Sequence, residues 1–172
     1  MNMIDAYISE FEQESETTHR VLEAVPEDRY DWRANEKGMS IGELCHHIAE
    51  LVNNMPDVLG GESFDIAMRD EPEGSPPSRD ELLADFDAAK ARASAWMGGL
   101  GDRAGETWKV FRGETELMSM PRSAAIRFFL LNHLYHHRGQ LSAYLRACGA
   151  SVPSVYGPTA DVNPFEETAV PA

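Results

Sequence analysis

The chain has no long apolar run, and this shortage excludes a membrane-spanning protein. Its 172 residues contain no uninterrupted apolar stretch of the length, about 18 residues, that a transmembrane helix needs. The N-terminal stretch MNMIDAYISEFEQESE is acidic, whereas a secretory signal begins with basic residues and continues with an apolar core. We therefore expect a cytoplasmic protein that does not associate with membranes.

Basic residues are scarce as well. The chain has 15 Lys and Arg residues against 29 Asp and Glu residues, which gives a formal net charge of −14 at pH 7. Nucleic-acid affinity comes mainly from Lys and Arg side chains that neutralise phosphates, so a surface this acidic repels DNA and RNA. The charge balance predicts that nucleic acid is not a partner.

The two cysteines, Cys45 and Cys148, exclude a disulfide-rich scaffold and match none of the usual metal or redox spacings. Both lie among residues with a helical pattern. Since free cysteine is among the most frequently buried residue types, we expect two buried thiols in a reducing compartment.

Apolar residues recur at steps of three and four along four segments, which predicts four amphipathic helices. These stripes cover residues 4–25, 41–55, 82–100 and 126–144. The length of the chain suits one domain, residues 1–172, with a sizeable core. Four such helices without a convincing sheet indicate an all-α four-helix bundle.

Local signals mark where these helices begin and end. Ser40 with Glu43, and Ser78 with Glu81, form capping boxes, in which side chains satisfy free backbone N–H groups at a helix start. Further start and stop signals are Pro26, Pro56, Gly60-Gly61, Gly98-Gly99, Pro121 and Gly149.

The connections are less regular. Residues 61–77 are rich in Gly, Pro and acids and read as an exposed connection, while residues 106–120 predict either a short hairpin turning at Arg112-Gly113 or an extended loop. Residues 152–165 are too rich in proline for a helix and are expected to strap across the bundle. The long connections leave room for a crossover between helices.

Three of the six histidines fall within five positions: His133, His136 and His137. His133 and His137 are four residues apart on an apolar stripe, so their rings share one helix face and can aim at one point inside the bundle. His136 lies about a third of a turn away. One metal ion would need another ligand, for which His47 at the margin of the second stripe is better placed than His46. Hydrogen-bonded core histidines are the structural alternative.

Helix one has polar residues in the middle of its apolar stripe. Ser15 and Thr18 occupy stripe positions, with Glu16 and His19 beside them. This pattern indicates either a wet cavity in the bundle or polar residues tolerated near its edge.

The sequence resembles the DinB-like (DinB/YfiT-type) metal-binding four-helix-bundle superfamily over nearly its whole length. The matching segments are VPEDRYDWRANEKGMSIGELCHHIAE, NHLYHHRGQLSAYLRACG and VPSVYGPTAD, in that order. In this superfamily three histidines hold a metal, and they correspond to His47, His133 and His137. The resemblance also implies a crossover connection and a homodimer.

Relatives with an assigned reaction include transferases and isomerases that use low-molecular-weight thiols. The resemblance therefore favours a divalent-metal-dependent enzyme, either a small-molecule hydrolase or a thiol S-transferase, because three ligands leave a position open. Zinc is the expected ion and nickel the next. The alternative is a non-catalytic metal-binding or stress-related bundle protein. A di-metal carboxylate site is disfavoured, since Glu43 precedes His46 by three residues but the last helix has no matching glutamate.

The remaining roles are open at this level. Glu16, His19 and His136 are candidates for a general base. Trp32, Tyr135, Arg138 and Tyr156 could face a substrate, although packing is the favoured role for each.

Overall fold

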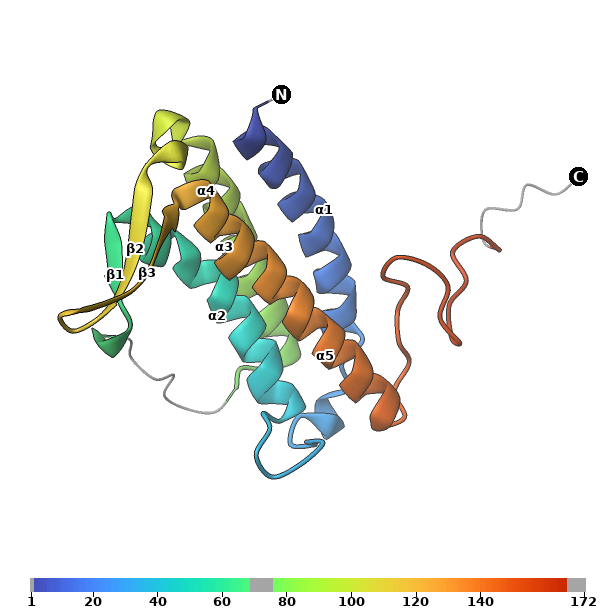
Figure 1. The fold of residues 1–172 in the computed structure, drawn as a ribbon. Coiled ribbons are helices and arrows are strands. Elements are labelled where there is room, and N and C mark those ends of the chain that lie inside the picture. Colours follow the sequence, from blue (N-terminus) through green and yellow to red (C-terminus); the bar gives the residue numbers. More distant parts are fainter. Residues whose placement is uncertain (1, 69–75, 167–172) are drawn as a thin grey trace, which may run out of the picture.

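The computed structural model describes residues 2–68 and 76–166, and it shows a helical bundle with a small sheet on one side (Figure 1). The long helices are α1 (Met3–Glu23), α2 (Ile41–Gly60), α3 (Arg79–Gly98) and a composite last helix. That last helix consists of α4 (Arg122–Ala125), the π-helical segment η4 (Ile126–Asn132) and α5 (His133–Ala147). The four predicted helices are therefore present.

Helix boundaries follow the local signals. Ser40 accepts a hydrogen bond from the Glu43 N–H at 3.2 Å, and the Ser40 N–H donates to the Glu43 carboxylate at 2.7 Å. The Ser78 capping box is also present, which confirms both predicted helix starts. Gly149 has a φ of +82°, the left-handed conformation that ends a helix and that glycine adopts without strain.

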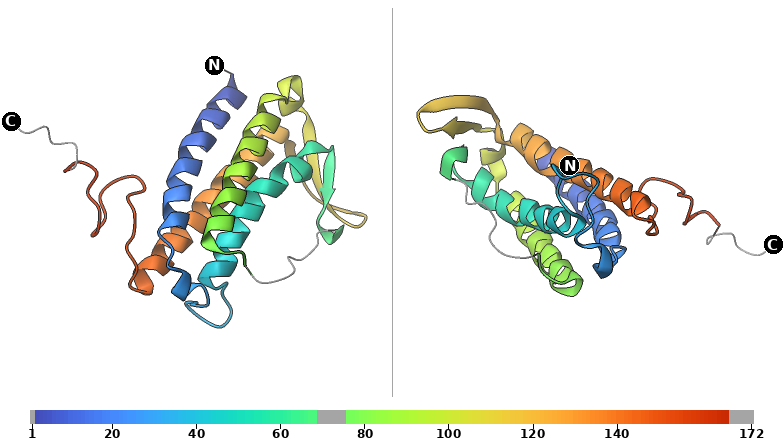
Figure 2. Two further views of the ribbon diagram at one scale, coloured as in Figure 1. Left: turned by 180° about the vertical axis from the view of Figure 1, so that it is seen from behind. Right: turned by 90° about the horizontal axis from the view of Figure 1, so that it is seen from below.

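The four long helices enclose the core (Figure 2). Helix α3 packs against both α1 and α2, and α5 packs against α2 and α1. The apolar stripes meet inside, where Phe11, Ile48, Phe86 and Leu141 are fully or almost fully buried. Within the described residues, no helix combines the length and apolarity that a membrane crossing requires.

A three-stranded sheet corrects the all-α prediction. Its order is β1 (Ser63–Asp65), β2 (Thr107–Arg112) and β3 (Thr115–Pro121), with β1 parallel to β2 and β2 antiparallel to β3. Of the two alternatives for residues 106–120, the hairpin is correct, and Gly113 supplies the positive φ of +57° at its turn. Strand β1 was missed because it is three residues long and forms only by pairing with residues 109–111, far along the chain.

The connection expected over residues 61–77 is therefore partly structured, by β1 and the short helix η2 (Ile66–Met68). Residues 69–75 of that segment lie outside the described residues. The Asp65 carboxylate accepts hydrogen bonds from the N–H groups of Ala67 (2.9 Å) and Gly113 (3.1 Å). One side chain thus joins the end of β1 to the turn of the hairpin.

Buried Arg122 joins the sheet side to the end of α2. Its guanidinium is 0% exposed and donates to the backbone carbonyls of Leu59, Gly61 (2.6 Å) and Arg103 (3.2 Å). The last carbonyls of a helix have no partner within the helix, and a cation is favourable at that end. The carbonyls of Leu59 and Gly61 at the end of α2 thus have a hydrogen-bond donor.

The segment after α5 lies along the α1–α5 edge and then projects away from the bundle, rather than lying across the helices as expected (Figure 1). Tyr156 contacts both helices, because its hydroxyl donates to the Glu14 carboxylate at 2.8 Å and accepts from Arg138. Further along, Asp161 pairs with Arg146 at 2.6 Å.

Candidate metal centre

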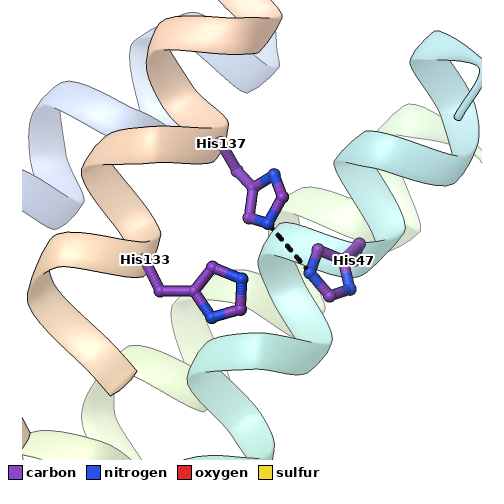
Figure 3. Close-up of side chains that lie close together, drawn as sticks. All are labelled: His47, His133 and His137. Atoms are coloured by element: carbon purple, nitrogen blue, oxygen red, sulfur yellow. Dashed lines mark hydrogen bonds between the residues drawn. The ribbon is translucent and has the colours of Figure 1, made fainter. Parts of the chain in front are cut away.

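Three imidazoles from two helices meet at one point of the bundle (Figure 3). His47 projects from α2, while His133 and His137 project from successive turns of α5. Each offers one ring nitrogen, and the three nitrogens lie within 4.8 Å of one another. The structure therefore brings together the three residues that the sequence selects.

The separation of two of these nitrogens suits a shared ion. Nε2 of His47 and Nε2 of His137 are 3.1 Å apart. Two imidazole nitrogens bound to one tetrahedral zinc at roughly 2.0–2.1 Å would be about 3.3 Å apart. Little movement is needed to place an ion between them.

The other nitrogen of His137 is held by Gln140. Nδ1 of His137 lies 3.1 Å from Oε1 of Gln140, whose Nε2 donates to the Tyr144 hydroxyl at 3.1 Å. A hydrogen bond of this kind keeps the proton on Nδ1 and aims the lone pair of Nε2 at the common point. Gln140 was not singled out in the sequence, although its position one turn after His137 is the signal that could have identified it.

Burial favours the form of His137 that binds metal. His137 is 8% exposed, and this desolvation lowers its pKa below the usual 6.5, against a smaller opposite effect of Gln140. A metal ligand must be neutral imidazole, so a lowered pKa reduces competition from protons.

The loop between α1 and α2 supports the same group. Tyr144 packs edge-on against Trp32, with ring centroids 5.4 Å apart, and a Cβ added at Gly38 would lie 3.1 Å from the Tyr144 hydroxyl. Trp32 therefore supports Gln140 indirectly: it packs against Tyr144, and the Tyr144 hydroxyl accepts a hydrogen bond from Gln140.

A cavity of about 630 Å³ opens beside the histidines, and His47 and His133 are among the residues that line it. The rest of its wall comes from α2, from η4 and from the sheet side of the molecule, including Phe64, Ile66, Trp108, Val110 and Phe129. Its volume lies within the range of small-molecule sites, about 300–1,000 Å³. The small sheet thus supplies a cavity wall that an all-α prediction does not contain.

Two of the proposed general bases lie elsewhere. Glu16 and His19 line a separate surface hollow between α1 and α3, where Glu16 pairs with Lys90, and His19 lies 3.5 Å from Asp87. His136 is exposed, with its ring centroid 4.7 Å from that of His137. The position of Glu16 and His19 beside the apolar stripe of α1 does not by itself determine which neighbouring helix they face.

The polar stripe of α1 is buried. Ser15 and Thr18 have no exposed surface, and the Thr18 hydroxyl donates to the backbone carbonyl of Glu14 at 2.8 Å. Neither residue lines the cavity beside the histidines.

Arg138, Tyr135 and Tyr156 form a different cluster, on the α1 side of α5. Arg138 is 2% exposed and pairs with Glu14 at 2.6 Å, and the Tyr135 hydroxyl donates to Glu10 at 2.7 Å. The Arg138 guanidinium also lies over the rings of Tyr135 (5.4 Å) and Tyr156 (5.1 Å). These contacts support packing roles for Arg138 and Tyr135, while Tyr156, which is 73% exposed, bonds to both α1 and α5 through its hydroxyl.

The carboxylate that a di-metal site would use is engaged elsewhere. Glu43 caps α2 through the Ser40 N–H, a hydrogen bond that lowers the pKa of Glu43. Both cysteines are free thiols; Cys45 is buried, which raises its pKa to about 12, and Cys148 is partly buried.

Comparisons with known proteins give the family and the fold of this chain. The DinB family model matches residues 1–164. An uncharacterized Bacillus subtilis protein, YrdA, is 23% identical over 158 residues, which cover 90% of this chain and 89% of YrdA. Two solved structures share the fold at 20% identity: a DinB-like protein, YjoA, from B. subtilis (TM-score 0.65, 90% of this chain and 98% of that one) and a DinB-like protein from Bacillus cereus (0.68, 88% and 97%).

Proposed function

Because this chain belongs to the DinB family, we propose that it is a metal-dependent protein whose ion is held by His47, His133 and His137. One observation carries the proposal: three imidazole nitrogens converge within 4.8 Å, and two of the three histidines line a cavity of small-molecule size. Imidazole donors suit zinc, nickel, copper and iron, and we propose zinc first and nickel next.

The activity that fits best is a metal-dependent reaction of a small molecule, either hydrolysis or S-transfer from a low-molecular-weight thiol. A divalent ion held by three neutral imidazoles would lower the pKa of a water or thiol in its remaining position toward neutrality. Gln140 fixes the ring of His137, and the sheet wall shields the space where a substrate would lie. We further propose a cytoplasmic homodimer, which light scattering would test.

The first experiment measures metal content by inductively coupled plasma mass spectrometry on protein purified without a histidine tag. We expect near-stoichiometric metal in the wild type and its loss in His47→Ala and in His137→Ala. His19→Ala is the matched control, because His19 lies in the hollow between α1 and α3. Folded wild-type protein that stays metal-free after incubation with zinc or nickel would overturn the proposal.

Metal-loaded protein is then assayed with thiol and electrophile pairs and with hydrolysable esters and amides. Turnover that disappears in His137→Ala and with chelation supports the enzyme. Stoichiometric metal without turnover, together with a chelation-dependent fall in melting temperature, would instead support a non-catalytic ion that joins α2 to α5.

A further inference from the structure

The cavity beside the histidines has two chemically different sides. One side is apolar and partly aromatic, with Phe64, Ile66, Trp108 and Phe129. Trp108 is 1% exposed and is held in place because its indole N–H donates to the carbonyl of Val58 at 3.2 Å. This side suits the hydrocarbon or aromatic body of a ligand.

The other side is a polar stripe on α2. Glu50, Asn54 and Asp57 follow His47 at steps of three and four, so they share the helix face that lines the cavity. Two of the three are acids, and no Lys or Arg is found among the described residues that line this space. A carboxylate or phosphate group on a ligand would meet negative charge along this stripe.

The two acids differ in their partners. One guanidinium nitrogen of Arg92 donates to both carboxylate oxygens of Asp57, at 2.7 and 2.8 Å, and this ion pair offsets the charge of Asp57. The Glu50 carboxylate lies 3.8 Å from the imidazole of His46, which can offset its charge only when that imidazole is protonated. The Glu50 side chain is 29% exposed, so its charge is only partly screened by water. Glu50 is therefore the acid on this stripe that is available to a ligand.

We propose that the cavity binds a small organic cation, with its ammonium or amidinium group at Glu50 and its apolar body against Phe64 and Phe129. A charge-assisted hydrogen bond to a partly desolvated carboxylate is stronger than a neutral one, and aromatic faces also attract cations. This inference rests on the proposed function, because it names the class of molecule that the metal would meet.

The test uses three probes with the same ring: phenethylamine, 2-phenylethanol and phenylacetate. Calorimetric titration measures affinity for zinc-loaded and for metal-free protein, and the Trp108 indole N–H resonance reports whether the ligand is in the cavity. In both forms the amine should bind about ten times more tightly than the alcohol, and phenylacetate should bind weakest to the metal-free form.

Glu50→Gln should remove the preference for the amine, and Glu12→Gln, which removes an exposed acid from α1, should leave it unchanged. Phe129→Ala should weaken the amine and the alcohol equally. Equal affinities of amine and alcohol for the wild type, or a preference that survives in Glu50→Gln, would overturn the inference. Metal content is measured on the same samples. A protein that binds the amine but holds no metal would contradict the proposed function and leave this inference standing.

Discussion

If His137 binds a metal ion, we expect Gln140 to control how well it does so, and replacing Gln140 gives the sharpest test of the site. Gln140→Leu keeps a side chain of similar size but removes the acceptor that lies 3.1 Å from Nδ1 of His137. The ring of His137 can then rotate or carry its proton on Nε2, the nitrogen that faces His47. Loss of such a partner typically weakens metal affinity about 10- to 100-fold, or roughly 1.4–2.7 kcal/mol.

The assay is a competition titration of zinc between the protein and a chromogenic chelator at pH 7.5. The melting temperature of the metal-free variant, measured beside it, separates a ligand effect from general destabilisation. Gln13→Leu, an exposed position on α1, is the matched control and should bind zinc as the wild type does. An unchanged zinc affinity in Gln140→Leu would refute the argument that this hydrogen bond orients His137.

Three further outcomes follow from the structure. Arg122→Ala should lower the free energy of unfolding, measured with urea, by about 1–3 kcal/mol, because the buried carbonyl of Leu59 at the end of α2 loses its donor; exposed Arg112→Ala should change it little. The lowered pKa of His137 means that the unfolded chain binds more protons than the folded one just below pH 6.5, so metal-free protein should lose stability as pH falls from 6.5 to the folded-state pKa. Urea titrations at pH 5 and 7 should show a smaller difference in His137→Ala. Gly113→Val should destabilise the hairpin by about 1–3 kcal/mol, because φ is +57° there; unchanged unfolding would contradict this.

Much of the helical framework was predictable because its signals are local. The capping boxes at Ser40 and Ser78 lie within four residues of sequence, and the structure has both. The two histidines at positions 133 and 137 were predictable in the same way, because residues four apart on one helix lie side by side. The choice of His47 over His46 rested on which side of the apolar stripe each occupies.

What the sequence did not predict depends on contacts between distant segments. Strand β1 forms because Phe64 pairs with Val110 in the neighbouring strand. The three residues of β1 alone contain no pattern that predicts this pairing. Gln140 and Glu50 were overlooked because a polar residue on a helix is ordinary until the structure shows what it faces. Glu16 and His19, two candidates for a general base, do not reach the histidines, because the neighbour on that side of α1 is α3 and not α5.

The helices supply the histidines beside the cavity and the sheet supplies part of its apolar wall, an arrangement that protein engineers could use. The three histidines stand on α2 and α5, whereas Trp108 and Val110 stand on a hairpin whose turn is joined to β1 through Asp65. Libraries that vary cavity-facing hairpin positions would change which molecules fit, while the histidines keep their backbone support. A change confined to the hairpin would therefore alter one wall of the cavity and leave the three histidines on their two helices.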